Sequence, residues 1–197
     1  MPDFSIESSF WRRGHRWIAG VDEAGRGCLA GPVVAAAVVL APDTTLDALD
    51  DSKKLTPAAR ETLLEAISAE ALAVGVGYGS PAEIDELNIL HASLEAMRRA
   101  VGDLALPPDY VLVDGNREIA DAPWPQEAVV KGDARSLSIA AASVVAKVTR
   151  DRLMIRLHDD FPEYGWAGHK GYPTASHYAA LRTHGPSPHH RRSFRLA

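Results

Sequence analysis

The sequence predicts an α/β domain in which helices flank a mixed sheet of five strands. Two observations predict this class. Apolar runs of strand length alternate with longer segments whose apolar residues recur every three to four positions, which is the spacing of one helix face. Strands that alternate with helices in this way form a sheet covered by helices. The 197 residues, of which 46% are hydrophobic, suit a single domain with a sizeable core.

The predicted strands are apolar runs that end at polar or glycine-rich segments. A run of Val and Ala follows the break at Gly31 and Pro32, and it is typical of a buried strand. The third run alternates and contains three glycines. Strands are expected over residues 17–23, 32–40, 71–79, 110–113 and 128–130.

Capping residues mark the predicted helices. Thr56 stands before Pro57, and Ser80 begins a capping box that Glu83 completes. Helices are expected over about 57–70, 81–101, 136–158 and 174–183, after a leading arm or short helix in residues 1–16. Residues 1–160 should form the main domain, and residues 161–197 a small helical extension with a basic tail, packed on it.

The composition of the chain argues against several classes of protein. The formal net charge of −5 argues against coating nucleic acid by bulk charge, yet residues 131–156 hold six basic side chains against two acidic ones. The single cysteine, Cys28, excludes an internal disulfide and suits a reducing compartment. The chain shows no leader segment and no apolar run of membrane length. We therefore expect a cytoplasmic protein with no membrane partner.

Four acidic residues follow apolar strands. Asp22 and Glu23 end the first strand, Asp114 follows the fourth, and Asp133 follows the fifth. Carboxylates gathered at strand ends repel one another unless a cation lies between them. An all-oxygen ligand set favours Mg²⁺ or Mn²⁺, and two such ions can serve phosphodiester hydrolysis. The alternative for each acid alone is a turn residue or a helix N-terminal acid.

A glycine loop follows the first pair of acids. Gly25 and Gly27 allow the main chain to approach a ligand closely, and Arg26 between them offers donors suited to phosphate. Neighbouring strand residues face opposite sides, so Asp22 and Glu23 converge only if the strand ends or bends there.

These segments together resemble the bacterial ribonuclease HII family. The matching stretches are GVDEAGRGCLAG (20–31), DSKKL (51–55), IDELNILH (84–91), VDGN (113–116), VKGD (130–133), IAAASVVAKVTRD (139–151), HKGYP (169–173) and HHRRSF (189–194). They span most of the chain in order. Two departures, Cys28 where the family commonly has proline and Arg135 where it commonly has lysine, touch none of the acids.

The resemblance implies a ribonuclease H-like fold and an endonuclease that cuts the RNA strand of RNA–DNA hybrids. It also implies nicking on the 5′ side of a single ribonucleotide in duplex DNA, with 3′-hydroxyl and 5′-phosphate products and two Mg²⁺ or Mn²⁺ ions on the four acids. The loop 25–27 would read the 2′-hydroxyl, the group that distinguishes RNA from DNA. Tyr172 would pack on the sugar of the following deoxynucleotide.

Weaker assignments concern phosphate contacts and assembly. Ser143 and Lys147 share a helix face four residues apart, and they are expected to contact phosphate together with Lys53. A solvated helix face and a polar loop are the alternatives. The protein is expected to be a monomer. Two other functions stay open at this point: another ribonuclease H-like nuclease, and a non-catalytic nucleic-acid-binding module whose acids merely cap strands.

Overall fold

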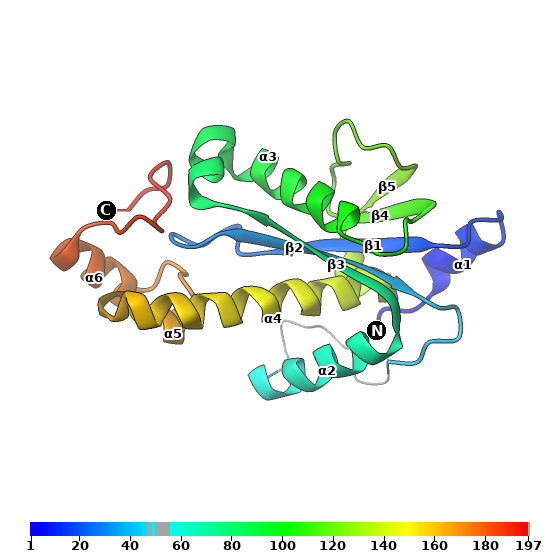
Figure 1. Cartoon of the computed structure of the whole chain (residues 1–197), viewed down its shortest axis with the longest axis horizontal. Helices are drawn as coiled ribbons and strands as arrows, with labels where there is room; N and C mark the ends of the chain where they lie inside the picture. Colours follow the sequence, from blue (N-terminus) through cyan, green and yellow to red (C-terminus); the bar gives the residue numbers. More distant parts are fainter. Residues whose placement is uncertain (47–48, 50–55, 197) are drawn as a thin grey trace.

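The computed structural model describes residues 1–46, 49 and 56–196, and its centre is one five-stranded sheet (Figure 1). The strands are β1 (Ile18–Ala24), β2 (Val33–Leu40), β3 (Ala71–Gly79), β4 (Tyr110–Asp114) and β5 (Gln126–Val129), in the spatial order β3-β2-β1-β4-β5. β2 runs antiparallel to its neighbours β1 and β3, whereas β4 lies parallel to β1 and β5. The sheet is therefore mixed, as predicted, and the carboxyl ends of β1, β4 and β5 meet at one edge.

Helices cover both faces of the sheet (Figure 1). α3 packs on one face, while α4 and α2 pack on the other, and α5 and α6 lie at the far end of α4. None of the described helices is long and apolar enough to cross a bilayer. The helices are α1 (Ser5–Trp11), α2 (Pro57–Glu70), α3 (Pro81–Gly102), α4 (Leu137–Asp160), α5 (Trp166–His169) and α6 (Ala175–His184), with 3₁₀ turns η1 (Gly132–Ala134) and η2 (Pro162–Tyr164).

Side-chain caps begin the four longer helices. Ser80 accepts a hydrogen bond from the backbone of Glu83 while Glu83 accepts one from the backbone of Ser80, which confirms the predicted capping box. Three other helices begin at single caps, namely Thr56, Ser136 and Thr174.

Glycines let two helices lie directly on the sheet. A β-carbon at Gly77 of β3 would stand 2.1 Å from the carbonyl oxygen of Ala96 in α3. A β-carbon at Gly20 of β1 would stand 2.2 Å from the carbonyl carbon of Ser138 in α4. These positions therefore need glycine for packing, and Gly20 sets how close α4 comes to the central strand.

The N-terminal helix anchors the start of α4. Glu7 of α1 is fully buried, and its Oε1 accepts hydrogen bonds from Ser136 Oγ at 2.6 Å, Ser138 Oγ at 2.8 Å and Ser138 N at 3.0 Å. A carboxylate at this position also interacts favourably with the positive end of the helix. Residues 1–16 thus hold the N-terminus of the helix that underlies the site.

Three local predictions need correction. β5 begins two residues earlier and ends one residue earlier than predicted; Val130 is exposed, and Lys131 adopts a left-handed conformation that ends the strand. Asp133 consequently lies in η1 rather than at a strand end. α3 is interrupted at Asn88 (φ 66°), whose side chain caps the next turn by accepting from Leu90 N at 3.0 Å.

Candidate active site

Three of the four predicted acids line one pocket of about 390 Å³ at the carboxyl edge of the sheet. The parallel register pairs Val21 with Val113, so Asp22 and Asp114 follow the last paired residues of adjacent strands. Glu23 joins them although strand alternation would direct it to the other face. The other residues that line this pocket are Ala24, Gly25, Arg60, Ser143, Lys147 and Tyr172.

Asp22 is the most deeply buried of these carboxylates, with 6% of its surface exposed. Burial raises the pKa of Asp22 well above its usual range, and the charges of Glu23 and Asp114 raise it further. Hydrogen bonds from Ser143 and from the backbone N–H of Glu23 oppose this rise in pKa. Burial also raises the pKa of Glu23, against the opposing effect of Arg26, whose Nη1 lies 3.1 Å from Glu23 Oε1. The pocket therefore concentrates negative charge that a cation would stabilise.

The backbone of Asp133 lies beside the side chain of Asp114. Asp114 Oδ1 accepts hydrogen bonds from Gly132 N at 2.7 Å and from Asp133 N at 3.3 Å. The side chain of Asp133 is half-buried and is not among those that line the pocket. The structure thus gathers Asp22, Glu23 and Asp114, and it leaves the role of Asp133 as a prediction.

The donors suit a hard divalent cation. As the side chains lie, no three of the His, Cys, Asp and Glu residues in the described ranges are close enough together to bind one metal ion. Contacts with Arg26 and with the turn at 132–133 already occupy oxygens of Glu23 and Asp114. The all-carboxylate donor set and the buried like charges nevertheless fit Mg²⁺ or Mn²⁺. Asp22, Glu23 and Asp114 are the residues of this pocket that would hold such an ion.

The glycine loop borders the acids. Gly25 has φ +96° and is buried, and a β-carbon there would stand 2.0 Å from Nε of Arg150. Only glycine fits this position, for reasons of both conformation and space. Arg26 and Gly27 are exposed, so the outer side of the loop is open to a ligand.

Two fully buried arginines support this loop and the segments beside it. Arg191 donates from Nη2 to Gly25 O at 2.7 Å, from Nη1 to Arg26 O at 2.8 Å and from Nε to Gly31 O at 3.0 Å. Burial lowers the pKa of Arg191 to about 10. Arg150 donates to the carbonyls of Pro32, Lys170 and Ala30 at 2.9–3.0 Å. The sequence shows Arg150 as one of the basic residues of 131–156 and Arg191 as part of the basic tail, and the structure shows both as buried internal supports.

Tyr172 lines the same pocket and remains 39% exposed. Lys147 Nζ lies 5.4 Å from its ring centroid, and Arg150 Cζ lies 5.9 Å away. The backbone of the preceding Gly171 accepts a hydrogen bond from Leu29 N at 2.8 Å, which ties this loop to the segment after the glycine loop. The predicted sugar-reading ring and Gly25 of the predicted 2′-hydroxyl-reading loop thus line the pocket that holds the acids.

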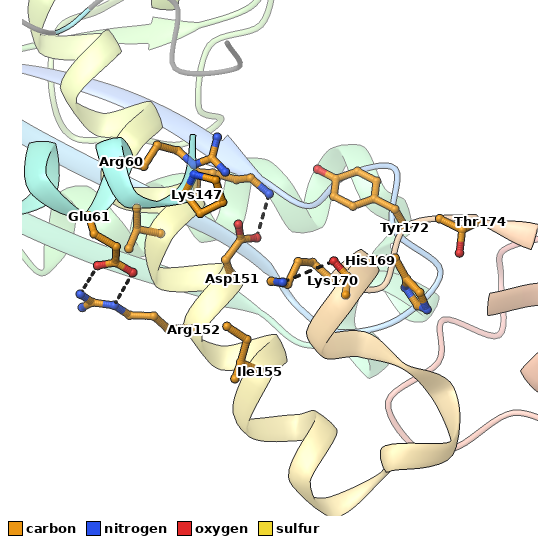
Figure 2. Close-up of a pocket in the computed structure, with 13 residues that line it drawn as sticks. Arg60, Glu61, Lys147, Asp151, Arg152, Ile155, His169, Lys170, Tyr172 and Thr174 are labelled. Atoms are coloured by element: carbon orange, nitrogen blue, oxygen red, sulfur yellow. Dashed lines mark hydrogen bonds and ion pairs between the residues drawn. The ribbon is translucent and has the colours of Figure 1, made fainter. Parts of the chain in front are cut away.

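A second pocket of about 440 Å³ adjoins the first, and Figure 2 shows its lining. Arg60, Lys147 and Tyr172 line both pockets. Lys147 Nζ lies 2.8 Å from Asp151 Oδ1, and Arg152 forms an ion pair with Glu61 of α2. The two pockets form a groove between α2, α4 and the loop that carries Tyr172.

The weaker sequence predictions concern Ser143, Lys147 and Lys53. Ser143 is buried in the acid pocket and hydrogen-bonded to Asp22, and Lys147 lines the groove; phosphate contact stays a prediction for both. Lys53 lies outside the described residues. Arg60 was not predicted, because α2 shows no motif that separates it from a solvated helix cation.

Comparison with known proteins identifies the family. The family model described as Ribonuclease HII matches residues 19–197. The chain is 56% identical to "Ribonuclease HII" of Salinibacter ruber over 98% of both chains, and 57% identical to that of Geobacter sulfurreducens over 98% of this chain and 88% of the relative.

Solved structures show the same architecture. The ribonuclease H2 of Pyrococcus horikoshii superposes with a TM-score of 0.73 at 30% identity, covering 91% of this chain and 94% of that one. The RNase HII of Archaeoglobus fulgidus, solved in a complex with PCNA, gives 0.75 at 29% identity, with coverage of 92% and 96%. A Bst-RNase HIII solved with Mn²⁺ shares the fold at 18% identity, with a TM-score of 0.67 over 86% of this chain and 63% of that one. The predicted ribonuclease H-like fold is confirmed, and the chain belongs to the ribonuclease HII family of enzymes.

Proposed function

We propose that the protein is an endonuclease that hydrolyses the RNA strand of RNA–DNA hybrids and nicks duplex DNA on the 5′ side of a single ribonucleotide. The observation that supports this proposal is a single pocket lined by three carboxylates, by the glycine loop and by an exposed tyrosine. This combination favours a nuclease over the binding module, because a module has no use for buried, mutually repelling carboxylates.

Asp22, Glu23, Asp114 and Asp133 would hold the divalent cations. Two such ions, held by these residues, would supply activation of water and stabilisation of the departing 3′ oxygen. Ser143 keeps Asp22 oriented through its hydrogen bond. The turn at 132–133 fixes one oxygen of Asp114 and brings the backbone of Asp133 to that carboxylate.

Recognition would come from the two loops beside the acids. The backbone of residues 25–27 would bind the 2′-hydroxyl, and the ring of Tyr172 would contact the next sugar. A substrate with a single ribonucleotide presents both features at one junction, which distinguishes this proposal from another ribonuclease H-like nuclease. Lys147 and Arg60 line both pockets of the groove, where a phosphate backbone would pass.

The direct test uses duplex DNA with one ribonucleotide, labelled at the 5′ end of that strand. With Mg²⁺ or Mn²⁺ we expect a single nick on its 5′ side, leaving a 3′-hydroxyl, and we expect none after chelation. All-DNA duplex is the control. Binding of the duplex without any metal-dependent nick would instead support the non-catalytic module.

Light scattering of the purified chain tests the predicted monomer. Cell fractionation tests the predicted cytoplasmic location.

A further inference from the structure

A buried chain of hydrogen bonds lies beneath Tyr172, outside both pockets. His177 of α6 is fully buried and His190 is 1% exposed. His177 Nδ1 lies 3.0 Å from the carbonyl oxygen of Tyr172, and its Nε2 lies 3.0 Å from His190 Nε2 and 3.2 Å from Trp166 Nε1. On the other side of His190, Nδ1 lies 3.0 Å from the backbone nitrogen of Ser187.

The partners determine which nitrogen carries each proton. Trp166 Nε1 can only donate and the Tyr172 carbonyl can only accept, so His177 carries its proton on Nδ1 and accepts at Nε2. The backbone N–H of Ser187 can only donate, so His190 accepts at Nδ1 and carries its proton on Nε2. The two assignments agree at the shared contact, where His190 Nε2–H donates to His177 Nε2. One neutral arrangement is therefore consistent with every contact from Ser187 to the Tyr172 carbonyl, with Trp166 and His190 sharing the single lone pair of His177 Nε2.

The same segment also supports the glycine loop. His190 precedes Arg191, which holds the carbonyls of Gly25 and Arg26, and His189 O accepts a hydrogen bond from Gly31 N at 2.9 Å. Residues 189–191 thus contact the glycine loop directly and reach the backbone of Tyr172 through His177.

We propose that His177, supported by His190, is a positioning residue that fixes Tyr172 relative to the glycine loop and so sets the preference for a single ribonucleotide in DNA over a continuous hybrid. This inference rests on the proposed role of Tyr172. Neither histidine touches substrate or the acids; each acts through the position of the Tyr172 backbone. Losing the contact leaves the cutting chemistry in place and loosens the ring that contacts the deoxynucleotide.

A matched pair of substitutions separates positioning from packing. In His177→Asn the side-chain amide nitrogen reaches the place of Nδ1, so the donor to Tyr172 is retained. In His177→Gln the amide reaches the place of Nε2, so the contacts with Trp166 and His190 are retained and the donor to Tyr172 is lost. The readout is the ratio of kcat/KM on single-ribonucleotide duplex to kcat/KM on a continuous hybrid. We expect His177→Gln to lower this ratio roughly tenfold and His177→Asn to keep it within about threefold.

Tyr172→Ala, measured beside them, separates failure of this inference from failure of the proposed function. If Tyr172→Ala lowers the ratio and His177→Gln does not, the inference is overturned while the role of Tyr172 stands. If Tyr172→Ala leaves the ratio unchanged, the proposed role of Tyr172 fails and the inference fails with it. Equal losses in the Asn and Gln variants would identify His177 as packing only.

A further variant covers poor folding of His177→Gln. His190→Asn keeps an acceptor for Ser187 N–H but removes the donor to His177, so the ratio should fall in the same direction by a smaller factor. An unchanged ratio in a folded His190→Asn protein would overturn the supporting role of His190.

Discussion

Arg191 Nη2 donates a hydrogen bond of 2.7 Å to the carbonyl oxygen of Gly25, although 166 positions of sequence separate the two residues. The same guanidinium serves Arg26 and Gly31. A planar fork of five donors can satisfy several carbonyls at once, which an ammonium cannot do in one geometry. The glycine loop therefore depends on a side chain near the C-terminus for its shape.

Replacing Arg191 by Lys should weaken both the fold and substrate binding. At least one buried carbonyl would lose its donor, at about 1–3 kcal/mol for each such group. We expect a loss of roughly 2–4 kcal/mol in the free energy of unfolding, measured in urea, and a higher KM for the single-ribonucleotide duplex. Arg192→Lys, at the exposed neighbouring position, is the control and should stay within about 0.5 kcal/mol of the parent. Equal urea midpoints for the two variants would contradict this account.

Asp22→Asn should abolish cutting and retain binding. Removing a cation-binding carboxylate forfeits several kcal/mol of transition-state stabilisation, so kcat should fall roughly a thousandfold. In chelator the same variant should unfold at a higher temperature, because a buried charge facing Glu23 and Asp114 is gone. Thermal melts and duplex-binding titrations check both parts. Turnover equal to that of the parent would remove Asp22 from the metal site.

Gly20→Ala should displace α4 from the sheet. The added β-carbon would stand 2.2 Å from the backbone of Ser138, so the helix must move. We expect a loss of roughly 3 kcal/mol of unfolding free energy, together with lower activity because α4 carries Ser143. Gly102→Ala, where nothing lies within 4 Å of the added carbon, should change stability by less than about 1 kcal/mol. Similar melting temperatures for the two variants would exclude tight packing at Gly20.

Lys147→Gln should reduce the salt dependence of substrate binding. If Lys147 contacts one phosphate, the slope of log K against log salt should become shallower by about one unit. Arg156→Gln changes an exposed charge on the same helix outside both pockets, and it should leave the slope unchanged. Identical slopes for parent and Lys147→Gln would remove the phosphate contact.

Acid should destabilise the native state through the buried histidines. Burial lowers the pKa of His190 to about 4, with smaller effects from His177 and His189, and burial also lowers the pKa of His177. Between about pH 6.5 and 4 the unfolded chain binds protons that the native state excludes, so unfolding free energy falls as pH falls.

Two further titratable groups contact these histidines: Tyr164 packs against His190, and His169 stacks on His177. The raised pKa values of Asp22 and Glu23 act in the opposite direction, because the native state then binds more protons than the unfolded chain. Urea titrations of parent and His190→Asn across this pH range isolate the histidine contribution as their difference. Parallel curves would contradict it.

Local patterns predicted most of the fold. The run from Val33 to Leu40 is fully buried, as a continuous apolar strand should be, and the capping box at Ser80 formed where the sequence placed it. The meeting of Asp22 with Asp114 also followed from the sequence, because parallel strands bring their carboxyl ends to one edge.

The parts that sequence could not predict depend on long-range contacts or small backbone energies. Nothing in the local sequence distinguishes Arg150 and Arg191, which are fully buried, from the exposed Arg152 and Arg192 beside them. Likewise, nothing in the local sequence indicates that Glu7 is buried; its burial depends on the packing of α1 against the start of α4. At Lys131 a single left-handed residue ends the strand early and moves Asp133 into a 3₁₀ turn.

The dependence of the glycine loop on Arg191 has a consequence for biosynthesis. All four acids have left the ribosome long before residue 191 is made, because translation proceeds from the N-terminus. Until then the carbonyls of Gly25, Arg26 and Gly31 lack the donor that joins them in the finished protein. A nascent chain can therefore carry all four acids and still lack the side chain that supports the glycine loop, so the loop reaches its final shape only after residue 191 has been made.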